Sequence, residues 1–256
     1  ADFFKSRLAG AGGTTEEEAG AEHTVFAFRA PDSPAAAEAD NGDPAGKAAA
    51  SGDFPASHPA YMREHCECEL EGIRLRLDTV YGAPDFDSPG GETTAAIKLA
   101  VKLGPSALLR AGKILVHEPG QGWFPAWLAG FLDPPPGALV LSGRNILALE
   151  AAAHNTGAET IPAAELYPAE TSADGRTAGN PYGLIAAFPE LIPGAGRLDA
   201  LWEGVSSALL ENGVFIVSLP SGEAERFDRK KKAGFVRLGD VRRNGFRALA
   251  YRRGVT

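Results

Sequence analysis

A glutamate and two glycines form the stretch of this sequence best suited to bind a small molecule. Glu118-Pro119-Gly120-Gln121-Gly122 comes directly after the apolar run Ile114-Leu115-Val116, which is long enough for one buried strand. Because glycine has no Cβ, a ligand can lie against the backbone at such a turn. Two glycines at this spacing are also typical of a plain tight turn, so both interpretations stay open.

The elements that must position this turn follow it in the sequence. A helical pattern with Phe124, Trp127 and Phe131 comes next, then a second apolar run over 138–141 and a second helical pattern over 146–153. Strand, turn, helix, strand and helix make a βαβ unit, which predicts a parallel sheet. Ligands of such sheets bind at the carboxyl ends of the strands, where this turn falls.

Further patterns extend the expected sheet. Apolar runs over 183–187 and 214–217 predict two more strands, and 197–210 predicts an amphipathic helix that ends at Asn212-Gly213. Two strand patterns, 235–238 and 246–251, flank Asn244-Gly245, which is a strong signal for an antiparallel hairpin. A helix is expected over 92–109, with an interruption near Gly104-Pro105 because proline cannot donate within a helix.

Composition divides the chain into two parts. Residues 1–60 form an acidic leader rich in alanine and glycine, which buries too little apolar surface to fold alone and is expected to be flexible. Its one apolar island, Val25-Phe26-Ala27-Phe28, is the candidate for an edge strand. Residues 61–256 are expected to form the folded domain.

Several classes of site and location are disfavoured by composition. The chain has a net charge of −8 and no apolar run of the ~18 residues that a membrane span needs. It has two cysteines, Cys66 and Cys68, and no signal-peptide pattern, so we expect a reducing, cytoplasmic location. His65-Cys66 and Cys68 have no second Cys/His pair nearby, and a structural zinc site needs four ligands; we expect no metal and place both cysteines on one face of a strand.

The order of these parts resembles a known family. The chain passes from Leu70-Glu71-Gly72-Ile73 to Tyr81–Phe86, then a helix and the glycine turn, and it closes on Ala233-Gly234-Phe235 and Phe246–Arg252. From about 71 to 253 this layout is similar to the class I S-adenosylmethionine (SAM) dependent methyltransferases, and most of all to the ribosomal RNA small-subunit guanine methyltransferases of the C type. The resemblance implies a Rossmann-like α/β fold with a mostly parallel seven-stranded sheet, a C-terminal antiparallel hairpin and helices on both faces.

The resemblance also implies where a bound SAM would lie. Its glycine loop falls on Glu118, Gly120 and Gly122, its ribose-binding segment on Gly143, Arg144 and Asn145, and an adenine-side position on Glu165. The substrate motif, which reads Asn-Pro-Pro-Phe in the family, falls on Phe188, Pro189 and Glu190. The loop that carries Phe86 either covers the cofactor, as in the family, or is a surface loop anchored by one aromatic ring.

Two expected groups are missing from these motifs. No carboxylate stands at Gly143, where the family has an acid that accepts both ribose hydroxyls, and Phe188 replaces the asparagine that holds the reacting amine. A hydrogen bond to a charged group contributes roughly 1.5–3 kcal/mol, so the first loss predicts weaker SAM binding by about ten- to a hundredfold. No catalytic residue is assigned.

The sequence therefore leaves two functions open. One is a SAM-dependent methyltransferase related to rRNA guanine methylation, in which Phe188 stacks on a base. The other is a degenerate methyltransferase fold that acts as a binding or scaffolding domain, with a pocket narrowed by Trp123, Phe124 or Arg144. Residues 201–256 hold 6 acidic and 11 basic side chains, which either grip RNA phosphates or form a solvated surface. A nicotinamide-dependent oxidoreductase shares the βαβ unit but is disfavoured by the C-terminal hairpin.

Overall fold

The computed structural model describes residues 14–19, 24–29, 60–109, 112–163, 182–190 and 197–254. The residues up to Lys47 and those from Ala48 onward form two separate units. In the first unit, strand β1 (Thr14–Ala19) pairs antiparallel with β2 (Thr24–Arg29), so the apolar island of the leader lies in a two-stranded hairpin. The rest of the expected leader lies outside the described residues.

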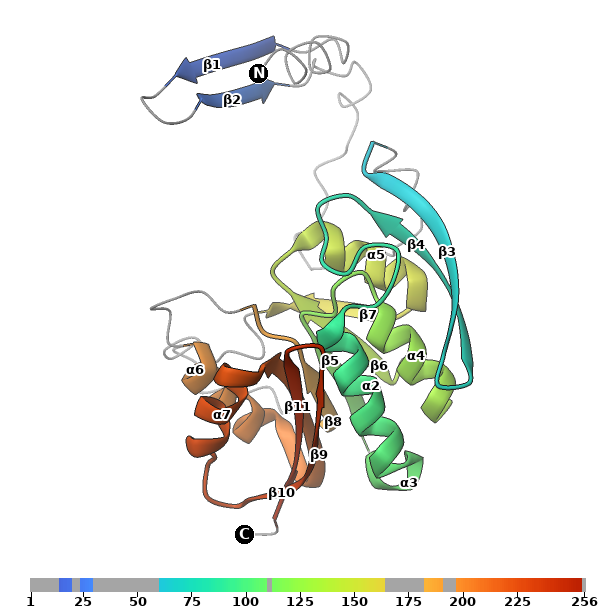
Figure 1. The fold of residues 1–256 in the computed structure, drawn as a ribbon, viewed down its shortest axis with the longest axis vertical. Coiled ribbons are helices and arrows are strands. Elements are labelled where there is room, and N and C mark those ends of the chain that lie inside the picture. The colour runs from blue at the N-terminus through green and yellow to red at the C-terminus, as the bar shows by residue number, and fades with distance from the viewer. Residues whose placement is uncertain are drawn as a thin grey trace, which may run out of the picture. The chain divides into compact units, whose positions relative to one another are not determined.

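The second unit contains a seven-stranded sheet in the order β10-β11-β9-β8-β5-β6-β7 (Figure 1). Five neighbouring strands run parallel, while β11 is antiparallel to both β9 and β10. The strands are β5 (Lys113–His117), β6 (Leu139–Gly143), β7 (Glu159–Pro162), β8 (Tyr182–Ala187), β9 (Leu209–Pro220), β10 (Phe235–Arg243) and β11 (Phe246–Arg253). The mostly parallel sheet and its C-terminal antiparallel hairpin, predicted from sequence, are confirmed.

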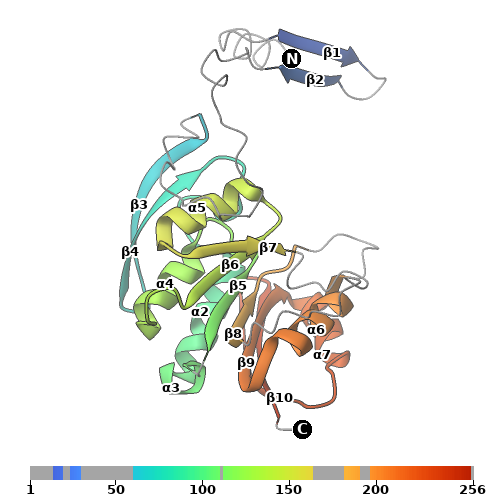
Figure 2. The ribbon, with the colours of Figure 1, turned by 180° about the vertical axis from the view of Figure 1, so that it is seen from behind.

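Helices cover both faces of this sheet, as Figure 2 shows from behind. One face packs against α2 (Gly91–Leu103), α3 (Pro105–Leu108), α4 (Trp123–Leu132) and α5 (Ile146–Thr156). The other face packs against α6 (Arg197–Ala208) and α7 (Ser221–Arg229), where Trp202 stacks on Phe227 with ring centroids 4.6 Å apart. The two cores take alternate residues of the same strands, Ile114 and Val116 on one face and Leu115 on the other, because successive side chains of a strand point to opposite faces.

A long hairpin covers helices α4 and α5. Strand β3 (Met62–Leu70) pairs antiparallel with β4 (Ile73–Val80), and the indole nitrogen of Trp127 donates to the carbonyl oxygen of Leu70 at 3.0 Å. Cys66 is buried and Cys68 half-buried on the same face of β3, as expected from their spacing. The hairpin brings the end of β4 to the carboxyl ends of β5 and β6.

The sequence predicted where two helices end, and one of the two predictions was wrong. Helix α2 ends at Leu103 before Gly104-Pro105, as predicted. The prediction that Asn212-Gly213 ends a helix was wrong, because α6 stops at Ala208 and Asn212, with φ 60°, lies in an irregular part of β9. A residue that tolerates positive φ marks a sharp change of direction, which occurs in strands as well as at helix ends. None of the helices in the described ranges is long and apolar enough to cross a membrane.

Candidate functional site

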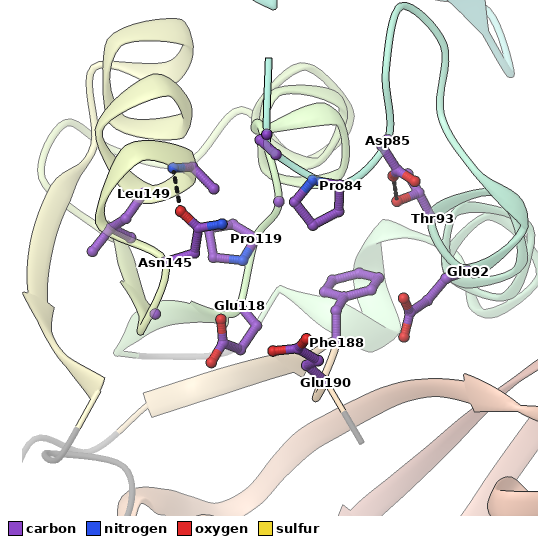
Figure 3. A pocket seen from close by; sticks show the side chains of 15 residues that line it. Pro84, Asp85, Glu92, Thr93, Glu118, Pro119, Asn145, Leu149, Phe188 and Glu190 are labelled. Carbon is purple, nitrogen blue, oxygen red and sulfur yellow. Dashed lines mark hydrogen bonds between the residues drawn. The ribbon is translucent and has the colours of Figure 1, made fainter. Parts of the chain in front are cut away.

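A cavity of about 450 Å³ opens at the carboxyl ends of β5, β6 and β8 (Figure 3). Five segments supply its walls: the loop after β4, the start of α2, the turn after β5, the segment from the end of β6 into α5, and the segment after β8. The lining residues are Gly82, Ala83, Pro84, Asp85, Glu92, Thr93, Glu118, Pro119, Gly120, Gly143, Asn145, Ala148, Leu149, Phe188 and Glu190. The cavity therefore stands where the parallel topology predicts a ligand site.

The glycine turn uses its two glycines for different purposes. Gly120 has φ 57° and lines the cavity, and a Cβ at this position would meet only the carbonyl oxygen of Pro84, at 3.8 Å. Gly122 has φ 103° and does not line the cavity, because it packs against α5, where a Cβ would lie 3.0 Å from the Cα of Ala152. Gly120 leaves space for a ligand, whereas Gly122 permits the close approach of two helices.

The residues between and after these glycines hold the cavity wall. Gln121 is fully buried, accepts a hydrogen bond from the Val80 backbone N–H at 2.6 Å and donates to the carbonyl oxygens of Pro84 and Asp85. The indole nitrogen of Trp123 also donates toward the Asp85 carbonyl oxygen, at 3.3 Å. The loop after β4 is thus fastened to the glycine turn, and Trp123 is a core residue rather than a pocket-narrowing one.

Glu118 has an unusual backbone conformation and a fixed side chain. Its φ is 54°, which is uncommon for a residue with a side chain. The guanidinium Nε of Arg144 donates to Glu118 Oε1 at 2.6 Å, and only 12% of the Glu118 side chain is exposed. A Cβ built on Gly143 would lie 3.4 Å from Glu118 Oε2, so this carboxylate stands directly beside Gly143.

A buried histidine lies beneath this ion pair. His117 ends β5, is fully buried, and its Nδ1 lies 2.9 Å from the hydroxyl oxygen of Ser142 at the end of β6. Burial, with a smaller contribution from the positive charge of Arg144, lowers the pKa of His117 to about 3. The histidine is therefore neutral at physiological pH and serves to join the ends of the two strands.

Two acids that the sequence interpretation did not select line the side of the cavity formed by α2. The Thr93 hydroxyl donates to Asp85 Oδ2 at 2.6 Å, and burial raises the pKa of Asp85 above its ordinary value. Burial, with the nearby charge of Asp85, raises the pKa of Glu92 to about 8. In the sequence Glu92 is indistinguishable from an ordinary acid in the first turn of a helix, which explains why it was missed.

The segment after β8 forms the floor of the cavity. Phe188 lines it and packs against Phe124 of α4, with ring centroids 5.0 Å apart. Glu190 lines it too, and its side chain is 75% exposed and reaches Arg144 at 3.4 Å. Pro189, between them, is buried and does not line the cavity. An aromatic face and a carboxylate thus border one opening.

The cavity gathers six of the eleven predicted site residues. Those that line it are Glu118, Gly120, Gly143, Asn145, Phe188 and Glu190. Arg144 lies behind Glu118, and Gly122 and Pro189 have packing roles. Phe86 is 58% exposed beside the guanidinium of Arg63 and does not line the cavity. Glu165 lies outside the described residues.

Side chains in the cysteine-bearing hairpin and in the basic C-terminal region have partners within the described part of the chain. Glu64, Cys66 and Asp87 approach one another, but the Asp87 carboxylate is taken by the guanidinium of Arg63 and the hydroxyl of Thr79. In the C-terminal region ion pairs engage Arg226, Lys230, Lys232, Arg237, Arg242 and Arg247. Much of the positive charge in the described part of this region is therefore balanced within the molecule.

Comparison with known proteins supports the fold and no closer relation. No family profile and no curated protein sequence matches the chain. The structure is similar to the putative methyltransferase yhhF from Escherichia coli, with a TM-score of 0.51 and 15% identity over 72% of this chain and 94% of that one. It is also similar to the 16S rRNA methyltransferase RsmC from T. thermophilus in complex with AdoMet and guanosine, with a TM-score of 0.48 and 16% identity over 75% of this chain. The chain spans 45% of the length of that protein.

A further match is the N-methyltransferase NodS from Bradyrhizobium japonicum in complex with S-adenosyl-L-homocysteine, with a TM-score of 0.49 and 13% identity over 62% of this chain and 85% of that one. The strand order, the antiparallel β11 and the similarity to the Escherichia coli protein together give this chain the class I methyltransferase fold, as the resemblance implied.

Proposed function

We propose that this chain is a SAM-dependent methyltransferase and that the cavity beside Gly120 holds the cofactor. A volume of about 450 Å³ is typical of cavities that enclose a cofactor-sized ligand. SAM supplies the methyl group, so the protein must chiefly bind and orient two partners, which is work for a shaped cavity. The cavity is open, and neither Trp123, Phe124 nor Arg144 lines it.

The observation that carries the proposal is the position of the Glu118 carboxylate. The family takes its ribose-binding acid from the residue after the second strand, and that residue is Gly143 here. Glu118 reaches the same place from the end of β5, with Oε2 3.4 Å from where a Cβ of Gly143 would stand. The ion pair with Arg144 orients the carboxylate. This position supports Glu118 as the acceptor for the ribose hydroxyls in place of a carboxylate at Gly143.

The charge of the cavity agrees with this cofactor. Its lining includes Asp85, Glu92, Glu118 and Glu190 but no lysine or arginine among the described residues. SAM carries a permanent positive charge on sulfur, so an acidic cavity favours it over anionic nucleotides such as phosphorylated dinucleotides. The same feature argues against a nicotinamide cofactor, whose phosphates need backbone or cationic donors.

For the substrate we propose a guanine base in RNA, as the resemblance to rRNA guanine methyltransferases suggests. Phe188 offers an aromatic face on which an unpaired base could stack. Glu190 offers an exposed carboxylate that can accept hydrogen bonds from an exocyclic amine. Because many C-terminal cations are paired internally, recognition would rest more on this base pocket than on phosphate contacts.

Calorimetric titration with SAM and with S-adenosylhomocysteine tests the cofactor. We expect micromolar binding of both by the natural chain and a loss of roughly tenfold or more in Glu118→Gln, because the charged acceptor is removed. Glu67→Gln is the matched control, since Glu67 is exposed on β3 and does not line the cavity. Failure of both ligands to bind the natural chain at millimolar concentration would overturn the proposal.

A second candidate is a methyltransferase fold kept as a binding or scaffolding domain. It is favoured by one observation, that Phe188 stands where the family has the asparagine that holds the reacting amine. Transfer of a labelled methyl group from SAM to guanine-containing RNA separates the two candidates. Labelled RNA supports the enzyme, whereas micromolar SAM binding without transfer to any RNA supports the binding domain.

A further inference from the structure

The cavity has two chemically different ends. Asn145 and Leu149 of α5 stand at one side of Figure 3, and Glu92 of α2 stands at the other, with Phe188 between them. The α5 end combines an apolar side chain with an amide, which suits a nucleoside. The α2 end is polar and acidic, and the proposed function as such gives it no task.

Asp85, the nearest acid, is already committed to the protein. Its carboxylate accepts hydrogen bonds from the Thr93 hydroxyl and from the backbone N–H of Gly90. A Cβ on Gly90 would fall 2.3 Å from Asp85 Oδ1, so Gly90 makes room for this carboxylate. Asp85 thus closes the loop onto the start of α2.

Glu92 has no such commitment in the described part of the chain. No hydrogen bond or ion pair of its carboxyl group is found there, although burial and the neighbouring Asp85 raise its pKa to about 8. Its backbone is fixed, because the Ser218 hydroxyl donates to the Glu92 carbonyl oxygen at 2.8 Å. A partly buried acid without a partner in the described part of the chain reduces stability, so its presence in a ligand cavity calls for an explanation in terms of the ligand.

We propose that Glu92 is a specificity-determining residue that recognises the positive charge of the bound ligand, either its α-ammonium group or its sulfonium. This inference rests on the proposed function, because it assigns a role within the same cavity. The nucleoside would then lie toward Asn145 and Leu149, and the charged amino-acid portion toward α2. The orientation leaves Phe188 and Glu190 beside the middle of the ligand.

Binding of a cation at this end has a measurable consequence. With a pKa of about 8, the Glu92 carboxyl group is mostly protonated at pH 7 before a ligand binds. A cation beside this group lowers its pKa, so the proton is released on binding. The other charged groups that face the cavity are Asp85, Glu118, Glu190 and, through Glu118, Arg144. Glu118 and Glu190 are paired with Arg144, which leaves Glu92 as the principal source of a released proton near pH 7.

The test is calorimetric titration of the full chain with SAM at pH 7 in two buffers of different ionisation enthalpy. The difference between the two apparent enthalpies gives the number of protons released. A group with a pKa of about 8 is about nine-tenths protonated at pH 7, so we expect release of about 0.9 proton per SAM by the natural chain. Glu92→Gln should release none and bind SAM roughly tenfold more weakly. Glu67→Gln should behave as the natural chain.

Two further ligands identify which charge is recognised. S-Adenosylhomocysteine keeps the ammonium group but lacks the sulfonium, and 5′-methylthioadenosine lacks both. Proton release with SAM and with S-adenosylhomocysteine assigns the ammonium to Glu92, whereas release with SAM alone assigns the sulfonium. Release of a proton with methylthioadenosine would contradict recognition of either charge.

The outcomes separate this inference from the proposed function. If the natural chain binds SAM without releasing a proton, or Glu92→Gln binds SAM as tightly as the natural chain, the role of Glu92 is wrong and the methyltransferase proposal stands. If the natural chain binds neither SAM nor S-adenosylhomocysteine, both are wrong. The proton measurement uses the natural chain, so it decides the question even if the variant folds poorly.

Discussion

Replacement of Gln121 by leucine would test how the cavity wall is held. Gln121 is fully buried and makes three hydrogen bonds that join the glycine turn to the end of β4 and to the loop after it. Leucine has a similar size but offers neither donor nor acceptor. The change therefore isolates the polar contribution of this side chain.

The expected cost follows from the groups left behind. The buried Val80 N–H loses its acceptor, which costs about 1–3 kcal/mol, and the Pro84 carbonyl loses a donor worth about 1 kcal/mol. The Asp85 carbonyl keeps the Trp123 indole as a donor, so its loss is smaller. The total is about 3 kcal/mol, or a fall in Tm of roughly 6–12 °C for a domain of about 200 residues.

Thermal unfolding followed by circular dichroism measures this change, and hydrogen exchange locates it. Gln121→Glu keeps the acceptor for Val80 but places a buried carboxylate against the carbonyl oxygens of Pro84 and Asp85, so at neutral pH it should destabilise at least as much as leucine. Glu69→Ala, an exposed change on β3, should change Tm by little. A fall of less than 2 °C in Gln121→Leu, or faster exchange spread evenly over the domain rather than centred on residues 80–86, would refute the reasoning.

Three further predictions concern backbone, pH and capping. Gly122→Ala should destabilise by about 2–4 kcal/mol in urea unfolding, because its φ of 103° and the close α5 backbone both oppose a Cβ, whereas Gly120→Ala should cost about 1 kcal/mol. The pKa of Glu92 is raised to about 8 in the folded state, so the free energy of unfolding should fall by about 2 kcal/mol as pH rises from 6.5 to 8, where the folded state loses a proton that the unfolded state has already lost. The pKa of His117 is lowered to about 3 in the folded state, so below pH 4.5 the free energy of unfolding should fall with falling pH, because only the unfolded state protonates this histidine. A urea series over pH that stays level above 6.5 would contradict the first half. Asn145→Ala should lose about 1 kcal/mol with the α5 N-cap, and Asn145→Asp should restore that stability.

Most of the fold could be predicted from the sequence because short residue patterns indicate its strands, its hairpin turn and one helix end. Apolar runs such as Val214–Val217 are long enough for buried strands only, and Asn244-Gly245 favours one kind of turn whatever its surroundings. Gly104-Pro105 broke the helix where it was predicted to break. These signals depend on steric properties of a few neighbouring residues, so they can be read without the tertiary structure.

Only part of the candidate site could be predicted from the sequence. Glu118 and Gly120 were found because a turn after a strand is a local feature, and the carboxyl ends of parallel strands meet at one edge of a sheet. The absence of a carboxylate at Gly143 could be seen from the sequence, but a spacing cannot tell that the Glu118 carboxylate lies beside Gly143 from another strand.

What only the tertiary structure decided is the environment of each side chain. Gly122 was grouped with Gly120 by spacing, but contact with Ala152, thirty residues later, gives it a packing role. In the sequence Glu92 resembles any acid at the start of a helix, and only the fold shows that it lines the cavity near Asp85 and opposite α5. Burial and charge are sums over neighbours that are distant in sequence. The sequence by itself therefore predicted the end of the sheet at which the cavity lies, whereas the fold determined which acidic side chains line that cavity.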